Sequence, residues 1–578
     1  MLNALKWAIR LTGLVCILRA AGDDRLLVPG PAGLRGGRLV AALRSEPKTL
    51  NWVVASDAGS REVLTRLMAD LIHINRETLQ VEPALAKSWT VSPDGLHWTL
   101  HLRSGVQFSD GHPFDADDVV FTFHAILDER VHSPQRDLLL LDNQAVAVRK
   151  VDSLTVGFDF PREYSVPERM FDGIWILPRH KLEGAWKEGR LAQVWGLGTD
   201  PAHVAGLGPF RFKEYLPGQH VVLERNPYYW KRDENGNQLP YLEAVMFLFV
   251  GAEDGQVMRF QAGESDVISR VGGRNFAVLE KDQQRRGYEM RDAGPGLEYS
   301  FLVFNLAGSN SAPQQAARVE FLNRKSFRQA VAIAVDRDAM VRLAYAGRAV
   351  PISVPVPAGN RLWVNGKIPA IAHSAENARR ILAADGFHWD RAGALLDAAG
   401  KPVEFSIVVG SNNPERMQMA GLIQDDLKQI GMRVHVVPLE FRSLVERVQR
   451  TRDFESALLA LASPDADPNP DMAVWLSSGG NHLWNPNQPS PATGWEAEID
   501  GLMRRQIATR DYAERKRMFD RVQEILAEYQ PMVALVTPHV LVGARKDLCN
   551  FRPAILEPST LWNIEQLYWR KGSSGSGR

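Results

Sequence analysis

The chain has 578 residues, more than one ordinary domain holds, so we expect two or three domains. Its 68 basic side chains (Lys and Arg) equal its 68 acidic ones (Asp and Glu) in number, and this balance argues against a broad nucleic-acid-binding surface. Two cysteines, Cys16 and Cys549, provide neither a disulfide framework nor a cysteine-based metal site.

The first residues are typical of a short signal peptide. Lys6 and Arg10 precede an apolar segment, 11–18, which small residues follow. Because this segment is too short to span a bilayer, we predict a signal peptide over 1–22 and export to the periplasm. A lipid anchor on Cys16 is one alternative, and a wrongly assigned start of the chain is another.

The next segments predict a linker, a strand and a helix. Residues 23–35 are rich in Gly, Pro and Arg and read as a linker before a strand at 37–43. A loop at 55–61 leads into a helix with apolar residues at helical spacing between Val63 and Leu71.

The segment 82–126 predicts a hairpin followed by a capped helix. Its turn is Pro-Asp-Gly at 93–95, where proline presets φ and glycine tolerates a positive φ. Apolar residues from Trp98 to Leu102 alternate with polar ones, as in a half-buried strand. Asp115 can accept backbone N–H bonds at the start of the helix.

Alternating strands and helices fill the rest of the chain. Alternation of apolar residues predicts strands at 154–160 and 432–436. Further strands are expected at 241–250 and, as a buried strand, at 299–305, and a hairpin between 206 and 230. Helical spacing predicts helices at 327–334, 374–387 and 419–430, and a last helix that begins near Asp511. Such an order indicates α/β lobes.

Several motifs give the chain a family resemblance. They are the segment 82–126, the pair Gly-Pro-Phe and Arg-Asn-Pro-Tyr-Tyr-Trp within 208–230, Gly-Glu-Ser-Asp at 263–266, and Ala-Val-Asp-Arg-Asp at 334–338. In this order the chain resembles the extracytoplasmic solute-binding proteins of family 5, the dipeptide and oligopeptide receptors of ABC importers. The resemblance covers roughly residues 37–570.

The resemblance implies an α/β, periplasmic binding protein-like fold of the class II, large three-domain type. Two lobes would hold a ligand cleft between them. The implied segments are signal peptide 1–22, linker 23–35, domain I 36–76, 174–297 and 534–571, domain II 77–173, domain III 298–533, and a flexible tail 572–578. The implied partner is an inner-membrane ABC permease complex, and we expect a monomer that binds no nucleic acid.

No enzyme motif stands out. The chain has no Gly-x-Ser-x-Gly elbow, no phosphate-binding Gly-x4-Gly-Lys-Ser/Thr loop and no His-Glu-x-x-His helix. We therefore predict a receptor without catalytic residues, cofactor or bound metal. A secreted hydrolase and a scaffold or chaperone-like surface protein are the alternatives from other classes.

The loop 462–470 is the predicted ligand-contacting loop. Burying the charged ammonium of a peptide is costly unless a fixed anion meets it, and an aspartate on a proline-stiffened loop suits that task. Peptide-binding members of the family hold the ligand's amine with an aspartate in a Gly-Trp-x-x-Asp-x-x-Asp-Pro motif. Asp465 is the best match, but Asp467 stays an alternative because the tryptophan is missing and the interval is one residue shorter. Both could instead only cap the loop.

Other predicted ligand contacts lie in three places. The segment 475–486 is dense in aromatic and small polar residues that could stack on a ligand or simply pack into the lobe. The strand at 299–305 could reach the crevice, and the loop at 55–61 reaches the cleft in the resembling family. The predicted residues are Ser56, Asp57, Tyr299, Phe301, Asn305, Trp475, His482 and Trp484. A peptide is the expected ligand, with nickel, haem or an oligosaccharide as alternatives within the family.

Overall fold

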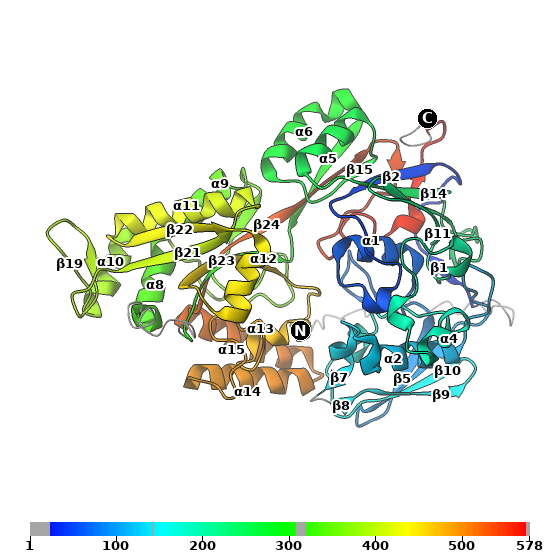
Figure 1. The fold of residues 1–578 in the computed structure, drawn as a ribbon, viewed down its shortest axis with the longest axis horizontal. Coiled ribbons are helices and arrows are strands. Elements are labelled where there is room, and N and C mark those ends of the chain that lie inside the picture. The colour runs from blue at the N-terminus through cyan, green and yellow to red at the C-terminus, as the bar shows by residue number, and fades with distance from the viewer. Residues whose placement is uncertain (1–23, 142–143, 308–319, 574–578) are drawn as a thin grey trace, which may run out of the picture.

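The computed structural model describes residues 24–141, 144–307 and 320–573. The predicted signal peptide, Cys16 and most of the predicted tail lie outside the described residues. The described residues form two lobes that lie side by side (Figure 1). The first lobe consists of residues 24–141, 144–297 and 539–573, and the second consists of residues 298–307 and 320–538.

One twelve-stranded sheet runs through both lobes. In the first lobe its strands are, in spatial order, β11 (Phe210–Leu216), β12 (His220–Arg225), β14 (Ala244–Phe249), β2 (Arg38–Leu43) and β15 (Val267–Ile268). In the second lobe they are β17 (Glu298–Phe304), β23 (Ser456–Ala462), β21 (Glu404–Gly410) and β22 (Arg433–Leu439). The strand β24 (Met532–Arg545) lies between the two sets. Segments far apart in sequence are therefore neighbours in the first lobe.

Strand β24 belongs to both lobes. Its first half pairs with β17 and β18 (Ala349–Pro351), and its second half pairs with β16 (Tyr288–Pro295). The pairing shifts register between Asp292 and Pro295 on β16 and between Ser300 and Phe301 on β17. Within the described residues, the chain crosses between the lobes along β24 and along the link from β16 to β17. Such irregular ladders are where a sheet bends.

The first lobe carries a second, antiparallel sheet. Its strands are, in spatial order, β5 (Ala86–Val91), β6 (His97–Leu102), β10 (Thr155–Asp159) and β9 (Ala147–Asp152). The helix α2 (Ala116–Leu127) packs on β9 and β10 beside α4 (Arg179–Lys187). The predicted hairpin and capped helix are confirmed, because Gly95 N–H donates to Ser92 O and Asp115 forms a capping box with Asp118.

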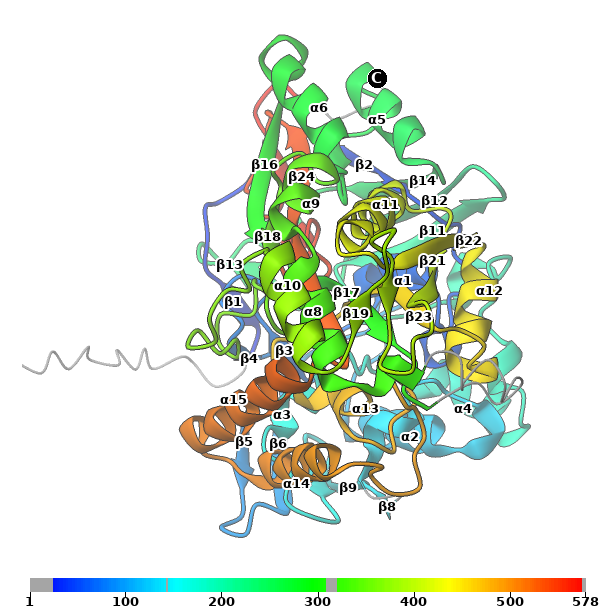
Figure 2. The same ribbon diagram turned by 90° about the vertical axis from the view of Figure 1, so that its left-hand side faces the viewer.

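The second lobe is layered around its strands. Figures 1 and 2 show α11 (Pro414–Gln429) on one side of β21–β23, and α14 (Gly494–Ala508) and α15 (Tyr512–Tyr529) on the other. Ile407 and Ile423 belong to the core on the α11 side, and Val408 and Phe519 belong to the core on the α15 side. Both faces of the sheet are thus covered, which explains why β21 is a nearly continuous apolar run.

The remaining elements are short or peripheral. The helices are α1 (Ala58–Leu67), α3 (Pro167–Met170), α5 (Glu253–Ala262), α6 (Gly273–Arg286), α8 (Lys325–Ala334), α9 (Arg337–Leu343), α10 (Ala375–Ala384), α12 (Phe441–Val445) and α13 (Met472–Trp475). The strands are β1 (Leu26–Val28), β3 (Ile72–Ile74), β4 (Val81–Pro83), β7 (Leu140–Leu141), β8 (Gln144–Ala145), β13 (Lys231–Asp233), β19 (His388–Trp389), β20 (Leu395–Leu396), β25 (Leu548–Cys549) and β26 (Tyr568–Trp569).

The predicted α/β fold is confirmed, with two local differences. The predicted loop 55–61 was too long, because Asp57 caps α1 by accepting the Ser60 N–H at 2.8 Å and the helix starts at Ala58. The predicted linker 23–35 contains β1, which pairs in parallel with β13. The domain boundaries given above stay our proposal.

Candidate functional site

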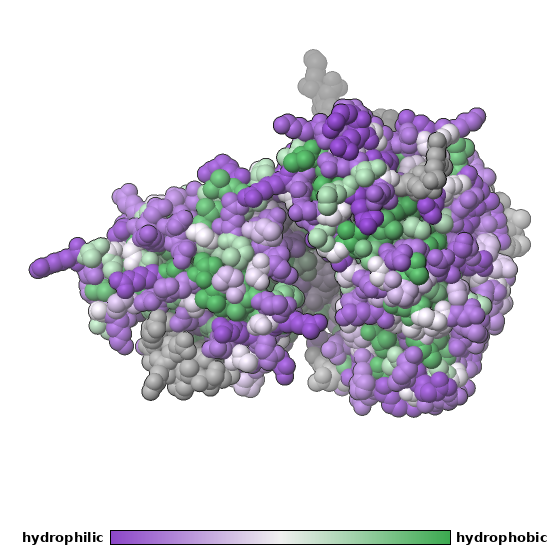
Figure 3. Space-filling view, turned by 45° about the horizontal axis from the view of Figure 1, so that its top comes forward, coloured by the Kyte–Doolittle hydropathy of each residue, from purple (hydrophilic) through white to green (hydrophobic). Residues whose placement is uncertain are grey.

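A groove separates the two lobes. Figure 3 shows it between the two masses of the molecule, with hydrophilic and hydrophobic residues mixed along its rims. Each wall of the groove belongs to one lobe. A change in the angle between the lobes would therefore change the width of the groove.

The loop after β23 contacts the first lobe. Arg169 on α3 places Nη1 2.6 Å from Oδ1 and 2.7 Å from Oδ2 of Asp465. Beside this ion pair, Ser165 N–H donates to Ile507 O at 2.7 Å, and Asn469 Nδ2 donates to Ser165 Oγ at 2.9 Å. Burial raises the pKa of the Asp465 carboxyl, and the nearby Arg169 guanidinium opposes that shift. Asp465 therefore lies between the lobes, but a guanidinium already meets it.

Asp467 lies inside the second lobe. Its two carboxylate oxygens each accept a hydrogen bond of 2.8 Å from the two terminal nitrogens of Arg515 on α15. The side chains of Arg515 and Asp467 are 2% and 4% exposed, so solvent does not screen this pair. Asp467 Oδ1 also accepts the Asn469 N–H at 3.0 Å. This carboxylate stabilises the loop.

A third aspartate of the loop was missed by the sequence analysis. Burial raises the pKa of Asp471 from 3.8 to about 6, and the charges of Asp465 and Asp467 add to the shift, whereas a hydrogen bond from Ser463 opposes it. No ion pair of the described residues involves Asp471. The sequence signal that could have found it is its position directly after Pro470, in the same acidic loop.

Asp471→Asn should stabilise the protein at neutral pH. Because the pKa is higher in the folded state than in the unfolded chain, stability is lost as pH rises from about 4 to about 6. Asparagine removes this cost, which we expect to be about 3 kcal/mol above pH 7 and close to zero at pH 4. Urea unfolding of both proteins at the two pH values measures it. A variant that is less stable than the wild type at pH 7.5 would contradict the assignment.

The predicted residues on β17 lie in the core of the second lobe. Tyr299 is 2% exposed and Phe301 is fully buried. Burial raises the pKa of the Tyr299 hydroxyl well above its ordinary value, with a smaller effect from Asp471. Asn305 donates from Nδ2 to Arg452 O at 3.0 Å and to Phe454 O at 2.9 Å. A ligand role for these three stays a prediction that their packing does not favour.

The aromatic segment 475–486 packs into the second lobe. Trp475 is 2% exposed, and His482 and Trp484 are fully buried. Trp484 Nε1 donates to Glu496 Oε1 at 3.1 Å, and His482 Nε2 lies 3.3 Å from the same oxygen. These side chains pack into the lobe beneath α14, which was the alternative to stacking on a ligand. Their ligand role also stays a prediction, which this packing does not favour.

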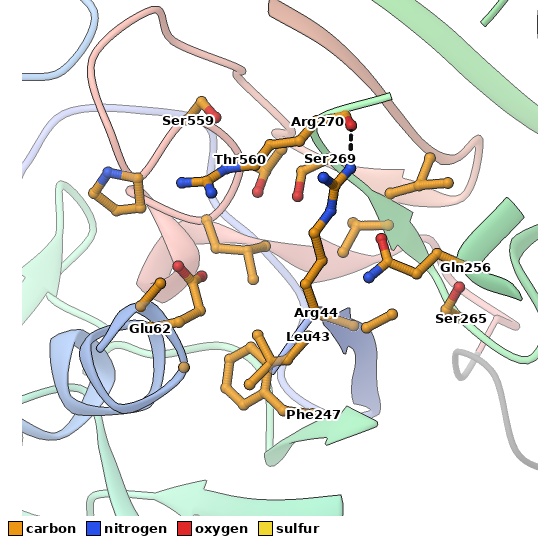
Figure 4. Close-up of a pocket in the computed structure, with 18 of the residues that line it drawn as sticks. Leu43, Arg44, Glu62, Phe247, Gln256, Ser265, Ser269, Arg270, Ser559 and Thr560 are labelled. Atoms are coloured by element: carbon orange, nitrogen blue, oxygen red, sulfur yellow. Dashed lines mark hydrogen bonds between the residues drawn. The ribbon is translucent and has the colours of Figure 1, made fainter. Parts of the chain in front are cut away.

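The predicted residues Ser56 and Asp57 flank a pocket of the first lobe. Asp57 caps α1, and Ser56 is exposed. The pocket has a volume of about 100 Å³ and is formed by the ends of β2 and β15, the start of α1 and the loop 557–561 (Figure 4). Its polar lining includes Arg44, Glu62, Gln256, Arg270, Ser559 and Thr560.

The charges of this pocket connect to the second lobe. Arg44 Nη2 donates to Arg270 O at 2.5 Å (dashed in Figure 4), and Arg270 Nη2 lies 3.1 Å from Glu557 Oε1. The pKa of Arg270 is raised mainly by Glu557, with a smaller contribution from Glu298 on β17 of the second lobe. Nearby, Arg274 Nη2 donates to Gln418 Oε1 of the second lobe at 2.5 Å, so the pocket lies near the boundary, or seam, between the lobes, with both signs of charge in its lining.

One further cluster has metal-ligand chemistry. Among the described residues, Asp70, His73 and Asp172 place ligand atoms within 4.8 Å of one another. Arg76 already pairs with Asp172, with Nη2 3.0 Å from Oδ2. The guanidinium of Arg76 thus already neutralises Asp172, one of the two carboxylates of this cluster. In the described part of the chain we also find no helix with the length and apolarity needed to cross a membrane.

Comparison with known proteins identifies the family. A sequence model described as bacterial extracellular solute-binding proteins, family 5 Middle, matches residues 80–482. The chain belongs to this family. The resemblance inferred from the segment 82–126 and the later motifs is thereby confirmed.

Relatives cover most of the chain. A probable ABC transporter-binding protein of Deinococcus radiodurans is 27% identical over 527 residues, 87% of each chain. The oligopeptide-binding protein AppA of Bacillus subtilis is 24% identical over 543 residues, 93% of this chain and 92% of AppA. The heme-binding protein A of Haemophilus influenzae is 25% identical over 496 residues, 82% of each chain.

The solved structures share the fold. The structure of B. subtilis AppA in complex with a nonapeptide superposes with a TM-score of 0.72 at 24% identity, and the match covers 93% of this chain and 100% of AppA. The predicted class II architecture is thus confirmed.

Proposed function

We propose that this family 5 protein is the exported receptor of an ABC importer, which captures peptides between its lobes and releases them unchanged to a membrane permease. The observation that carries the proposal is the groove between two lobes whose described residues connect covalently along two crossing segments, β24 and the β16–β17 link. Closure about such a hinge encloses a ligand and presents a new surface to a partner.

The chemistry of the seam supports a solute with both polar and apolar parts. The pocket beside Arg270 carries arginine and glutamate side chains together with Leu43 and Phe247. Backbone amides, charged termini and varied side chains of peptides match such a mixed lining. AppA and a dipeptide-binding protein of Escherichia coli are named for peptides, which favours this class of ligand.

A non-peptide solute is the second candidate. Relatives are also named for haem and for α-galactosides. The observation that favours this alternative is the pairing of Asp465 and Asp467 with arginines, because neither carboxylate stands open for a peptide amine. Export rests on the predicted signal peptide and on relatives named as periplasmic. We propose a monomer without catalytic activity.

The proposal predicts a bound, unconverted ligand. Mass spectrometry of gently purified protein should find a peptide, and refolded, ligand-free protein should gain stability when that peptide is returned. At a ligand concentration of about 100 times Kd the expected gain is about 2.7 kcal/mol, measured by thermal unfolding. Small-angle scattering should show a smaller radius of gyration for the bound form.

Controls separate the candidates. Haem and a mixed oligosaccharide pool, tested on the same ligand-free protein, report the second candidate function. A shift with either of them but not with the peptide would contradict the peptide assignment. Chemical conversion of any added solute would contradict the receptor role and favour the hydrolase alternative.

A further inference from the structure

Arg169 takes the position that a ligand's ammonium group would need at Asp465. Its Nη1 lies 2.6 Å from one carboxylate oxygen and 2.7 Å from the other, so a single nitrogen is shared by both oxygens. This is the arrangement in which a primary ammonium binds a carboxylate, rather than the fork in which two guanidinium nitrogens each take one oxygen.

The chain also holds this guanidinium in place. Nη2 of Arg169 donates to Leu79 O at 2.8 Å, in the turn between β3 and β4 of the first lobe. Oδ1 of Asp465 additionally accepts its neighbour's Ala466 N–H at 2.6 Å. The side chains of Arg169 and Asp465 are 15% and 9% exposed, so little solvent reaches the pair. A ligand amine that approached Asp465 would have to displace a buried and anchored cation.

Displacement of Arg169 from Asp465 would be unfavourable for both lobes. The released guanidinium would stay near Leu79 without a carboxylate, and an unpaired buried charge is costly. Two neighbouring carboxylates offer no replacement, because Arg76 pairs with Asp172 and Arg515 pairs with Asp467. The ion pair thus satisfies Asp465 from within the chain.

We propose that Arg169 is a specificity-determining residue: it substitutes for the ligand's ammonium at Asp465, so that the receptor does not require a free amino terminus on its ligand. The inference rests on the proposed peptide function and narrows it to a substrate class. Peptides with a blocked amino terminus bind as well as peptides with a free one.

Paired peptide pools test this. Synthetic hexapeptide pools of the same composition are prepared with free and with N-acetylated amino termini, and their affinities are measured by calorimetry. For the wild-type protein we expect the two affinities to agree within about threefold. In Arg169→Gln the carboxylate of Asp465 becomes available, and the free-amine pool should gain about tenfold or more over the acetylated pool, as a new charge pair at a buried carboxylate does.

Three variants complete the design. Arg169→Lys restores a cation and should return the affinity ratio to the wild-type value. The double change Arg169→Gln with Asp465→Asn should abolish the new preference, because the anion is gone. Arg130→Gln is the matched control, since it removes an exposed arginine that pairs with Asp128 in the same lobe and should leave the ratio unchanged.

The possible outcomes distinguish a failure of this inference from a failure of the peptide function. A wild-type protein that loses tenfold or more in affinity on acetylation would overturn the inference while it supports the peptide function. An unchanged affinity ratio in a folded Arg169→Gln protein would also overturn the inference. If the wild-type protein binds neither pool, the peptide function itself fails and the inference fails with it.

Discussion

Replacing Arg515 with Met should destabilise the protein by on the order of 3–5 kcal/mol, because the buried carboxylate of Asp467 would lose its only cation among the described ion pairs. Arg515 also donates from Nε to Gln506 Oε1 at 2.8 Å and lies over the ring of Trp363 at 4.9 Å. Methionine fills a similar volume but replaces none of the hydrogen bonds. Equilibrium urea unfolding at pH 7 measures the loss.

The same helix provides a matched control. Arg521 on α15 pairs with Glu498 at 2.8 Å, but both side chains are more than 40% exposed. Arg521→Met should therefore cost less than about 1 kcal/mol. An equal effect of the two substitutions would show that the helix, rather than the buried ion pair, determines the loss. The assignment of Asp467 as a stabilising residue of the loop depends on this difference.

Glu496→Gln should cost about 3 kcal/mol at pH 7. Burial raises the pKa of Glu496, but hydrogen bonds from His482, Gln488, Thr493 and Trp484 outweigh burial and lower the pKa from 4.5 to about 2. A carboxyl with a lowered pKa in the folded state stabilises the protein above pH 4.5, and the contribution is lost as pH falls towards 2. The size follows from about 1.4 kcal/mol for each tenfold change in acidity.

The pH dependence is the decisive readout. Glutamine resembles the protonated glutamate, so wild type and Glu496→Gln should differ in unfolding free energy at pH 7 and converge as pH approaches 2. Glu498→Gln, on the exposed side of the same helix, serves as the control and should change little at either pH. A gap that persists unchanged at low pH would indicate a packing effect of the substitution.

Local signals predicted the local structure well. The Pro-Asp-Gly turn at 93–95 and Asp115 at a helix start are confirmed in β5–β6 and α2, because turns and caps are formed by residues adjacent in sequence. The helix start at Ala58 was missed although its cap, Asp57, is also local. Alternation found β10, and the strands predicted at 241–250 and 299–305 are β14 and β17, with small errors in their ends.

The sequence predicted only some of the contacts in the candidate site. The sequence analysis identified the loop with Asp465 and Asp467, because charged residues between prolines after an apolar strand are conspicuous. It did not find Arg169, which lies 296 residues away from Asp465 and has no local signature. The aromatic segment with Trp484 suggested ligand stacking, but stacking on a ligand and packing under a helix require the same residues.

The sequence alone thus determined the family, the α/β class and the order of the elements, since periodicity, turns and motifs are properties of neighbouring residues. The tertiary structure decided which charges meet: Arg169 with Asp465 across the seam, and Arg515 with Asp467 inside the second lobe. The physical reason is that the free energy of a buried carboxylate depends on whichever cation folding brings beside it, and no spacing along the chain encodes that neighbour.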